Sequence, residues 1–296
     1  MILLTNEYLQ VSINPKGAEM VSVKDIKSNH EFMWQGNYRY WNRTAPVLFP
    51  IVGSLIDDRY QYEGKPYHLT QHGFARDMVF ETQTVTDNSA TFFLKSNADT
   101  LQVYPFEFSF QITYILFEDK VSISYEVLNP DAEKDLFYSV GGHPGFAVCH
   151  HRPMKGQPEF QGVSFSFEPA GAYYQVPIIK GRADLENGKF RKIEDEPILH
   201  KSFKRDALVF RLPTGTKVHL KDPNNGVTLT MSMSNFDYLG IWSSYPKKAG
   251  FVCLEPWAGI TDPLDASGDL VNKHGIIQLQ PGRIMTHDYT IQFQKQ

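Results

Sequence analysis

Cysteine is scarce in this sequence. The 296 residues include two cysteines, Cys149 and Cys253, which lie far apart and form no CxxC pattern. A disulfide framework and a CxxC metal or redox motif are therefore excluded. A reducing compartment is the simpler expectation for so few thiols.

Long apolar runs are also missing. No stretch approaches the ~20 residues that a membrane-spanning helix requires. The N-terminal segment MILLTNEYLQ has three apolar residues in a row before polar ones follow, without the basic start and longer apolar stretch of a signal peptide. We therefore expect a cytoplasmic protein that has no membrane partner.

An excess of either charge is absent as well. The chain carries 29 basic and 33 acidic residues, which gives a net charge of −4. Nucleic-acid binding usually requires a basic face, so we expect no nucleic-acid partner. Because 42% of the residues are hydrophobic and 21% are charged, extended disorder is excluded for most of the chain.

Sustained helical periodicity is also absent. Apolar and polar residues alternate along much of the chain instead. In FEFSFQITYILFE at 106–118, Phe106, Phe108 and Phe110 share one face. A second alternating segment, 120–128, follows a polar turn, so the two predict a hairpin. The same period recurs at 8–13, 78–86, 90–95, 163–167, 217–222, 227–233, 238–242, 251–254 and 285–294.

Many strands without intervening helices predict an all-β fold, a large antiparallel β-sandwich or a barrel. Short helical turns are expected near 98–103 and 200–207, and a surface loop at 150–162. No linker of domain-boundary quality is visible, so we expect one domain over residues 1–296.

Four segments break the alternation by mixing ionisable residues with aromatic residues, glycine and proline. They are 41–50, 71–76, 141–146 and 254–259. Taken singly, the histidines could be turn residues, Glu255 a strand-end carboxylate, and Phe146 and Trp257 core residues. Together they suit a sugar, because the C–H face of a sugar packs on an aromatic ring while its hydroxyls need hydrogen bonds. Phe146 and Trp257 are therefore candidate substrate contacts.

These motifs resemble a known family. GGHPGF, LEPWAG, HGFAR and the R-x-x-P-x-x-F-P segment beginning at Arg43 look like the aldose 1-epimerase (galactose mutarotase) family, closest to its LacX-like branch. The resemblance spans nearly the whole chain. It implies a large antiparallel β-sandwich, often called a supersandwich, with a hexose bound in an open cleft on one sheet.

The resemblance also implies residue roles. His143 matches the general acid of the family and Glu255 matches its general base. Among the substrate contacts, His72 matches a histidine that hydrogen-bonds the sugar, and Arg43 matches an arginine that contacts substrate hydroxyls. Asp206, in a shorter motif, matches an aspartate that binds a ring hydroxyl.

Arg76 is a further candidate in the cleft, without a firm family match. The chain departs from the classical mutarotases because it lacks their longer asparagine–histidine motif around the acid. It also departs from them in its spacing near the N-terminus. These departures bear on the identity of the sugar more than on the chemistry.

Interconversion of α and β anomers requires one base and one acid, and it proceeds through an open-chain aldehyde. No cofactor or metal is expected, since HExxH, CxxC and GxSxG patterns are absent. The adjacent His150 and His151 point to opposite faces if extended, which argues against a metal site. We expect Glu255 to be ionised and to raise the pKa of His143, with an acidic limb near ordinary Glu values.

Two other functions remain open. A hexose-6-phosphate 1-epimerase would need a cationic pocket, to which Arg43, Arg59 and Arg76 could contribute. A non-catalytic carbohydrate-binding or sensing protein on the same fold would dispense with the acid and the base. A β-rich domain without any site would require all four segments to be coincidental. Either a monomer or a homodimer is compatible with the sequence.

Overall fold

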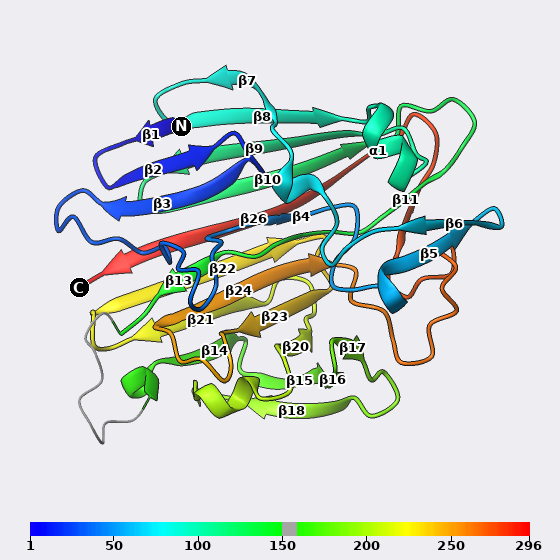
Figure 1. The fold of residues 1–296 in the computed structure, drawn as a ribbon. Helices are drawn as coiled ribbons and strands as arrows, with labels where there is room; N and C mark the ends of the chain where they lie inside the picture. The colour runs from blue at the N-terminus through cyan, green and yellow to red at the C-terminus, as the bar shows by residue number, and fades with distance from the viewer. Residues whose placement is uncertain (150–158) are drawn as a thin grey trace.

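The computed structural model describes residues 1–149 and 159–296, and strands dominate it (Figure 1). Strands make up 51% and helix 6%, which confirms the predicted all-β fold. The predicted turn at 98–103 is the helix α1 (Ala98–Val103), which Asn97 caps through its side chain. The turn expected at 200–207 is shorter, a 3-10 helix η4 (His200–Phe203).

The larger sheet is antiparallel and contains the 106–128 hairpin. In spatial order its nine strands are β19 (Glu196–Pro197), β14 (Ser164–Glu168), β21 (Lys217–Asp222), β22 (Val227–Ser234), β26 (Ile284–Lys295), β10 (Lys120–Leu128), β9 (Ser109–Phe117), β8 (Ser89–Lys95) and β7 (Glu81–Val85). The hairpin is confirmed because β9 and β10 pair from Phe117 opposite Lys120 to Ser109 opposite Leu128.

The second large sheet carries most of the unusual motifs. Its strands, in spatial order, are β18 (Lys189–Ile193), β15 (Gly171–Val176), β20 (Leu208–Arg211), β23 (Tyr238–Trp242), β24 (Phe251–Ala258), β12 (Val140–Gly142) and β4 (Val47–Leu48), with β13 (Gly145–Ala147) also paired to β24. Residues 254–258 of the fourth segment thus belong to strand β24, whereas the sequence pattern ended that strand at residue 254.

Smaller elements surround the two large sheets. Figure 1 shows the N-terminal three-stranded sheet near β7 and β8, and the β15–β18 edge at the opposite end. The small sheets are β1 (Ile2–Thr5), β2 (Leu9–Asn14) and β3 (Glu19–Asp25); β5 (Arg59–Tyr62) with β6 (Lys65–His68); β11 (Leu136–Tyr138) with β25 (Ile277–Leu279); and β16 (Ile178–Ile179) with β17 (Arg182–Ala183). The other short helices are η1 (Ile56–Asp58), η2 (Ala75–Asp77) and η3 (Glu159–Gly162).

The hydrophobic core lies between the two large sheets, where alternate residues of each strand meet. Phe210 of β20 packs against Phe167 and Phe165 of β14, with ring centroids 5.2 and 6.0 Å apart. Phe49, next to β4, stacks on Phe110 of β9 at 4.6 Å. This core covers the inner face of each large sheet. A site on the smaller sheet must therefore lie on its outer face.

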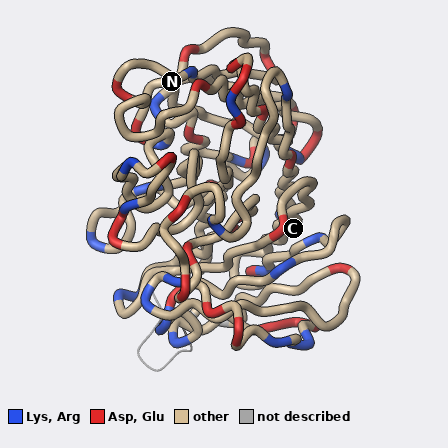
Figure 2. Tube along the Cα trace, turned by 90° about the vertical axis from the view of Figure 1, so that its right-hand side faces the viewer, with Lys and Arg blue, Asp and Glu red and all other residues tan. Residues whose placement is uncertain are grey.

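The predicted loop at 150–162 falls partly outside the described residues, together with His150 and His151. Its last residues, 159–162, form η3. Figure 2 shows acidic and basic residues interspersed along the described chain. Within that same part of the chain, no helix is long and apolar enough to cross a membrane.

Candidate active site

Strand β24 supplies the floor of the site. Because successive side chains of a strand alternate, Cys253, Glu255 and Trp257 share the outer face. On the neighbouring strand β23, the residues opposite them are Trp242, Gly240 and Tyr238 respectively. The position across from Glu255 therefore has no side chain, and the Trp257 indole occupies the space that it leaves.

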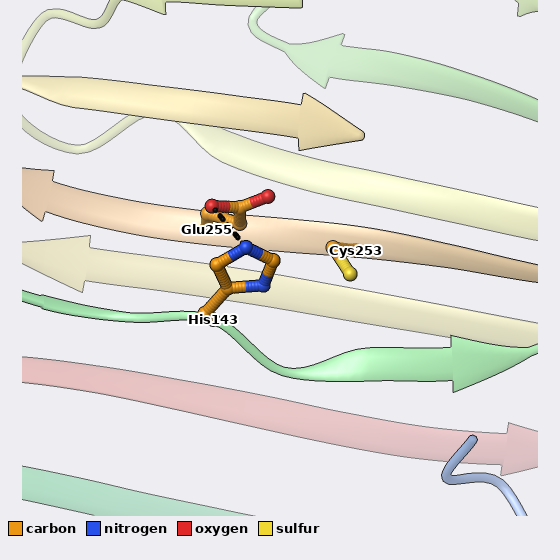
Figure 3. Close-up of side chains that lie close together, drawn as sticks. All are labelled: His143, Cys253 and Glu255. Atoms are coloured by element: carbon orange, nitrogen blue, oxygen red, sulfur yellow. Dashed lines mark ion pairs between the residues drawn. The ribbon is translucent and has the colours of Figure 1, made fainter. Parts of the chain in front are cut away.

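His143 comes from the bend that joins β12 to β13, and it reaches over β24 toward Glu255 (Figure 3). Its Nε2 atom lies 3.1 Å from Glu255 Oε2, and the two side chains are 10% and 2% exposed. The imidazole stacks on Trp41 with centroids 4.9 Å apart and meets the edge of Trp242 at 5.8 Å. Trp41 and Trp242 thus hold the imidazole ring in the position where it contacts the Glu255 carboxyl group.

Burial controls the protonation of this pair. Desolvation raises the pKa of Glu255 well above its ordinary value, and the charge of Asp206 adds to the rise. Desolvation also lowers the pKa of His143 to about 3. Both shifts run opposite to the expected ionised Glu255 and raised His143 pKa. Burial therefore favours the neutral carboxyl–imidazole form of the pair, whose atoms lie 3.1 Å apart.

His72 has a defined tautomer. It sits in a turn with a φ of 67°, a left-handed conformation that is uncommon for residues with a side chain. Its Nδ1 accepts a hydrogen bond from the backbone N–H of Gly53 at 3.1 Å. Desolvation keeps the pKa of His72 well below its usual value, so the ring is neutral and Nε2 carries its hydrogen. The Nε2–H group of His72 can therefore donate a hydrogen bond.

These side chains line one pocket of about 240 Å³ on the outer face of the smaller sheet. It unites all but two of the sequence-predicted site residues. The lining consists of Trp41, Pro46, Gly53, Gln71, His72, Arg76, His143, Ile178, Gly181, Asp206, Ala207, Trp242, Glu255, Trp257 and Thr261. The combination of aromatic walls with a few fixed polar groups is typical of a small-molecule site.

Asp206 and Arg76 contribute the remaining charged groups of the lining. Burial raises the pKa of Asp206, although its Oδ1 accepts a hydrogen bond from the Ala207 N–H at 2.8 Å. Arg76 follows His72 on the 71–76 segment and donates through Nη2 to the Gln71 carbonyl at 2.6 Å. Its Nε is buried, has no hydrogen-bond partner among the described residues, and lies 3.9 Å from Oδ2 of its ion-pair partner Asp77.

Two of the predicted substrate contacts do not line the pocket. Phe146 is fully buried between the sheets and packs near Phe293 of β26, because the alternation of β13 turns it toward the core. Arg43 forms an ion pair with Asp77 at 2.9 Å outside the lining, although its charge still acts on His72 and His143. Arg59, on the exposed side of β5, is likewise absent from the lining.

Trp257 does line the pocket, and two glycines make room for its indole. A Cβ at Gly240 would lie 2.8 Å from the Trp257 ring, and one at Gly141 would lie 2.9 Å from it. Gly141 and Gly240 stand on the strands that flank β24, opposite Trp257 and Glu255 respectively. The indole therefore occupies a slot that only glycine leaves open on both sides.

The sequence pattern did not single out Trp242, Gln71 or Thr261 as contacts. Trp242 lies in a regular strand, where it resembles a core residue until the pairing with Cys253 shows its face. Thr261 joins the pocket through its hydroxyl, which donates to the Gly181 carbonyl at 2.6 Å. Trp41 stood in one of the four unusual segments, and that position was the signal available for it.

Among the described residues, one group could hold a metal ion. It consists of His143, Cys253 and Glu255, whose ligand atoms all lie within 4.8 Å of one another (Figure 3). This group includes the His143–Glu255 contact.

Comparison with known proteins places this geometry in a family. The family model for aldose 1-epimerase matches residues 1–292. The chain is 31% identical over 291 residues to the chromosomal protein LacX of Lactococcus lactis subsp. lactis, covering 95% of each chain.

Two solved structures have the same fold. A galactose mutarotase related enzyme from Lactobacillus acidophilus is 37% identical, with a TM-score of 0.94 and coverage of 99% of this chain and 97% of that one. A galactose mutarotase-like protein from Lactobacillus casei ATCC 334 is 30% identical, with a TM-score of 0.91 and coverage of 99% and 100%. Sequence and fold agree over nearly the full length, and the chain belongs to the aldose 1-epimerase family.

Proposed function

We propose that this protein is an aldose 1-epimerase that interconverts the α and β anomers of a hexose. The observation that supports this best is the buried contact of His143 with Glu255 at 3.1 Å, on the floor of a pocket with fixed polar groups. A carboxyl group and an imidazole in contact can accept one proton while they deliver another.

Both proton transfers of the reaction can take place on the His143–Glu255 pair. In the neutral pair the proton lies on Glu255, so it first passes to His143 across the 3.1 Å contact. Glu255 then removes the proton from the anomeric hydroxyl, His143 delivers its proton to the ring oxygen, and the C1–ring-oxygen bond breaks to give the open-chain aldehyde. Rotation about the C1–C2 bond and the reverse transfers close the other anomer. One proton enters the pair and one leaves, so its single proton is conserved and no covalent intermediate is required.

The other lining residues would hold the sugar over the pair. His72 is set to donate from Nε2, and the guanidinium of Arg76 lines the same pocket. Asp206 offers a carboxylate to a ring hydroxyl. Trp41 and Trp257 provide the apolar surface on which the C–H face of the ring packs.

A hexose-6-phosphate is the second candidate substrate. Of the three arginines considered for a phosphate, Arg76 lines the pocket and Arg43 and Arg59 do not, and Asp77 pairs with both Arg76 and Arg43. A doubly charged group would then meet one cation beside the carboxylate of Asp206. This balance favours a neutral hexose.

The test is NMR or polarimetry of freshly dissolved α-D-glucose and α-D-galactose, and of the corresponding 6-phosphates at equal concentration. We expect the wild type to accelerate anomerisation of the free sugars. His143→Asn and Glu255→Gln should each lower kcat by roughly 10²–10⁴-fold. Acceleration that survives both substitutions would overturn the residue roles, and faster turnover of the 6-phosphates would replace the substrate.

Binding of a hexose without acceleration would favour the carbohydrate-binding or sensing alternative. Ligand-induced NMR shifts report such binding independently of turnover. Ser54→Ala is a matched control, because its backbone rather than its side chain supports Thr261. It should leave anomerisation within a few-fold of wild type.

A further inference from the structure

Cys253 has no role in the proposed acid–base chemistry, yet it stands beside the pair. Its thiol is free and fully buried, on the same face of β24 as Glu255. Figure 3 shows the Cys253 and Glu255 side chains on one strand, with the His143 ring extending over them from the adjacent segment. The three side chains bring together sulfur, nitrogen and oxygen donors.

The spacing of these donors suits a tetrahedral ion. Bond lengths of ~2.0–2.3 Å in a zinc site place neighbouring ligand atoms roughly 3.3–3.6 Å apart. The His143 Nε2 and Glu255 Oε2 atoms already lie 3.1 Å apart, and all three ligand atoms fall within 4.8 Å. Bringing the widest of these separations to that of a tetrahedral site requires a movement of at most about 1.5 Å.

A second observation concerns His143 itself. Its Nδ1 atom is buried and has no hydrogen-bond partner among the described residues, and the residue as a whole is 8% exposed. A buried polar atom without a partner is costly. One of the two ring nitrogens is therefore without a partner in the described protein, and either ring nitrogen of a histidine can serve as a metal ligand.

We propose that His143, Cys253 and Glu255 form an inhibitory site for a thiophilic divalent cation of the Zn²⁺ type. The three side chains supply one thiolate, one imidazole and one carboxylate. The fourth position faces the pocket, because His143 and Glu255 both line it. Three protein ligands with one open position is a recurrent zinc arrangement.

Charge balance favours occupation of this buried position. Binding displaces the thiol proton and the shared proton of the pair, so Zn²⁺ meets one thiolate, one carboxylate and a neutral imidazole. The resulting complex has no net charge, and a neutral group is tolerated in a buried position. Donor softness selects against Mg²⁺ and Ca²⁺, which prefer oxygen ligands.

Occupation would stop the reaction. The Glu255 carboxylate and the His143 lone pair would both be bound to the metal, so neither could transfer a proton to or from the sugar. The inhibition rests on the proposed function, whereas the binding itself does not. The two are therefore measured separately.

Binding is tested with Co²⁺, which reports thiolate ligation through a charge-transfer band in the near ultraviolet. We expect this band in the full-length wild type and its loss in Cys253→Ser. Cys149→Ser is the matched control, since Cys149 is the other free thiol and should leave the band intact. Absence of the band in the wild type, or its persistence in Cys253→Ser, would overturn the site.

Inhibition is tested by the ratio of mutarotation rates with and without Zn²⁺ in each variant, so that a change in basal rate cancels. Zn²⁺ should inhibit the wild type reversibly with EDTA, and Cys253→Ser should need at least ~10-fold more Zn²⁺. A His150→Ala/His151→Ala variant controls for the adjacent histidines and should remain sensitive. Equal sensitivity of Cys253→Ser would refute the proposal while leaving the proposed function in place.

Discussion

At the active-site pair, burial has a larger effect than the attraction between opposite charges. An exposed carboxylate would raise the pKa of a neighbouring histidine. Here both groups lose water, which raises the pKa of Glu255 and lowers that of His143 to about 3. The pair therefore keeps one proton over a wider pH range than the same residues would keep in water.

The first residue-scale prediction concerns pH. Inactivation by acid requires a second proton on the pair, which the lowered pKa of His143 places near about pH 3. Loss of the shared proton follows the raised pKa of Glu255 and gives the alkaline limb. We expect kcat/KM for the preferred hexose to stay level between about pH 5 and 6. An acidic limb at the ordinary Glu or His values would contradict this account.

The second prediction concerns stability. Because the folded-state pKa of Glu255 is above its ordinary value of 4.5, its neutral form is stabilising below that pH, and the advantage is lost as pH rises toward the folded pKa. Above pH 4.5 the folded protein must either keep Glu255 protonated or bury its charge, and both lower its stability. Glu255→Gln removes this cost and keeps a hydrogen-bonding group. We expect a higher melting temperature than wild type at pH 7 and a smaller difference near pH 4.5.

The control for this measurement is Glu186→Gln, which makes the same Glu-to-Gln substitution at an exposed position. It should change the melting temperature little at either pH. A Glu255→Gln variant that is less stable than wild type at pH 7 would show that the carboxylate is stabilised by its surroundings.

At the scale of elements, the strands flanking β24 shape the pocket because each has a glycine, without a side chain, beside Trp257. Gly240 on β23 and Gly141 on β12 leave the slot that the Trp257 indole fills. Pro256 also lies within β24, opposite Leu239, where it cannot donate a ladder hydrogen bond. This proline is one reason why the sequence pattern ended the strand too early.

Gly240→Ala tests the slot. The added methyl would lie 2.8 Å from the indole, so we expect Trp257 to shift, with a destabilisation of about 1–3 kcal/mol and weaker sugar binding. Chemical denaturation and KM for the hexose measure the two effects. Gly171→Ala, in β15 of the same sheet, is the control, because its Cβ would meet its nearest neighbour at 3.9 Å. Equal effects of the two substitutions would contradict the slot.

At the scale of the whole molecule, the two large sheets hold each other in place through aromatic contacts. Phe210 packs against Phe165 and Phe167 across the interface and is fully buried. The core cluster includes residues from Leu4 to Phe293, so both ends of the chain contribute to it. The assignment of residues 1–296 to one domain agrees with this and stays a prediction, as does the choice between monomer and homodimer.

Phe210→Ala should cost about 3–5 kcal/mol and lower the melting temperature by roughly 5–15 °C. The pocket lies on the opposite face of the sheet, so activity at low temperature should remain within a few-fold of wild type. Phe190→Ala removes the same group from a position that is 72% exposed, and it should change stability little. A similar loss in both variants would contradict the packing argument.

The sequence by itself determined the strand pattern and the all-β class, and it proposed His143 and Glu255 as the acid–base residues. Period-two alternation is a local property, so it predicted hairpins such as β9–β10 from neighbouring residues. The motifs around His143 and Glu255 indicated a family before any contact between them was known.

Only the tertiary structure decided which face each residue occupies and what surrounds it. Phe146 lies in the core, Arg43 pairs with Asp77, and Trp242 lines the pocket, all because strand pairing joins segments far apart in the chain. The reversed pKa shifts of the pair have the same origin. Desolvation depends on every neighbour in space, and a linear sequence does not record those neighbours.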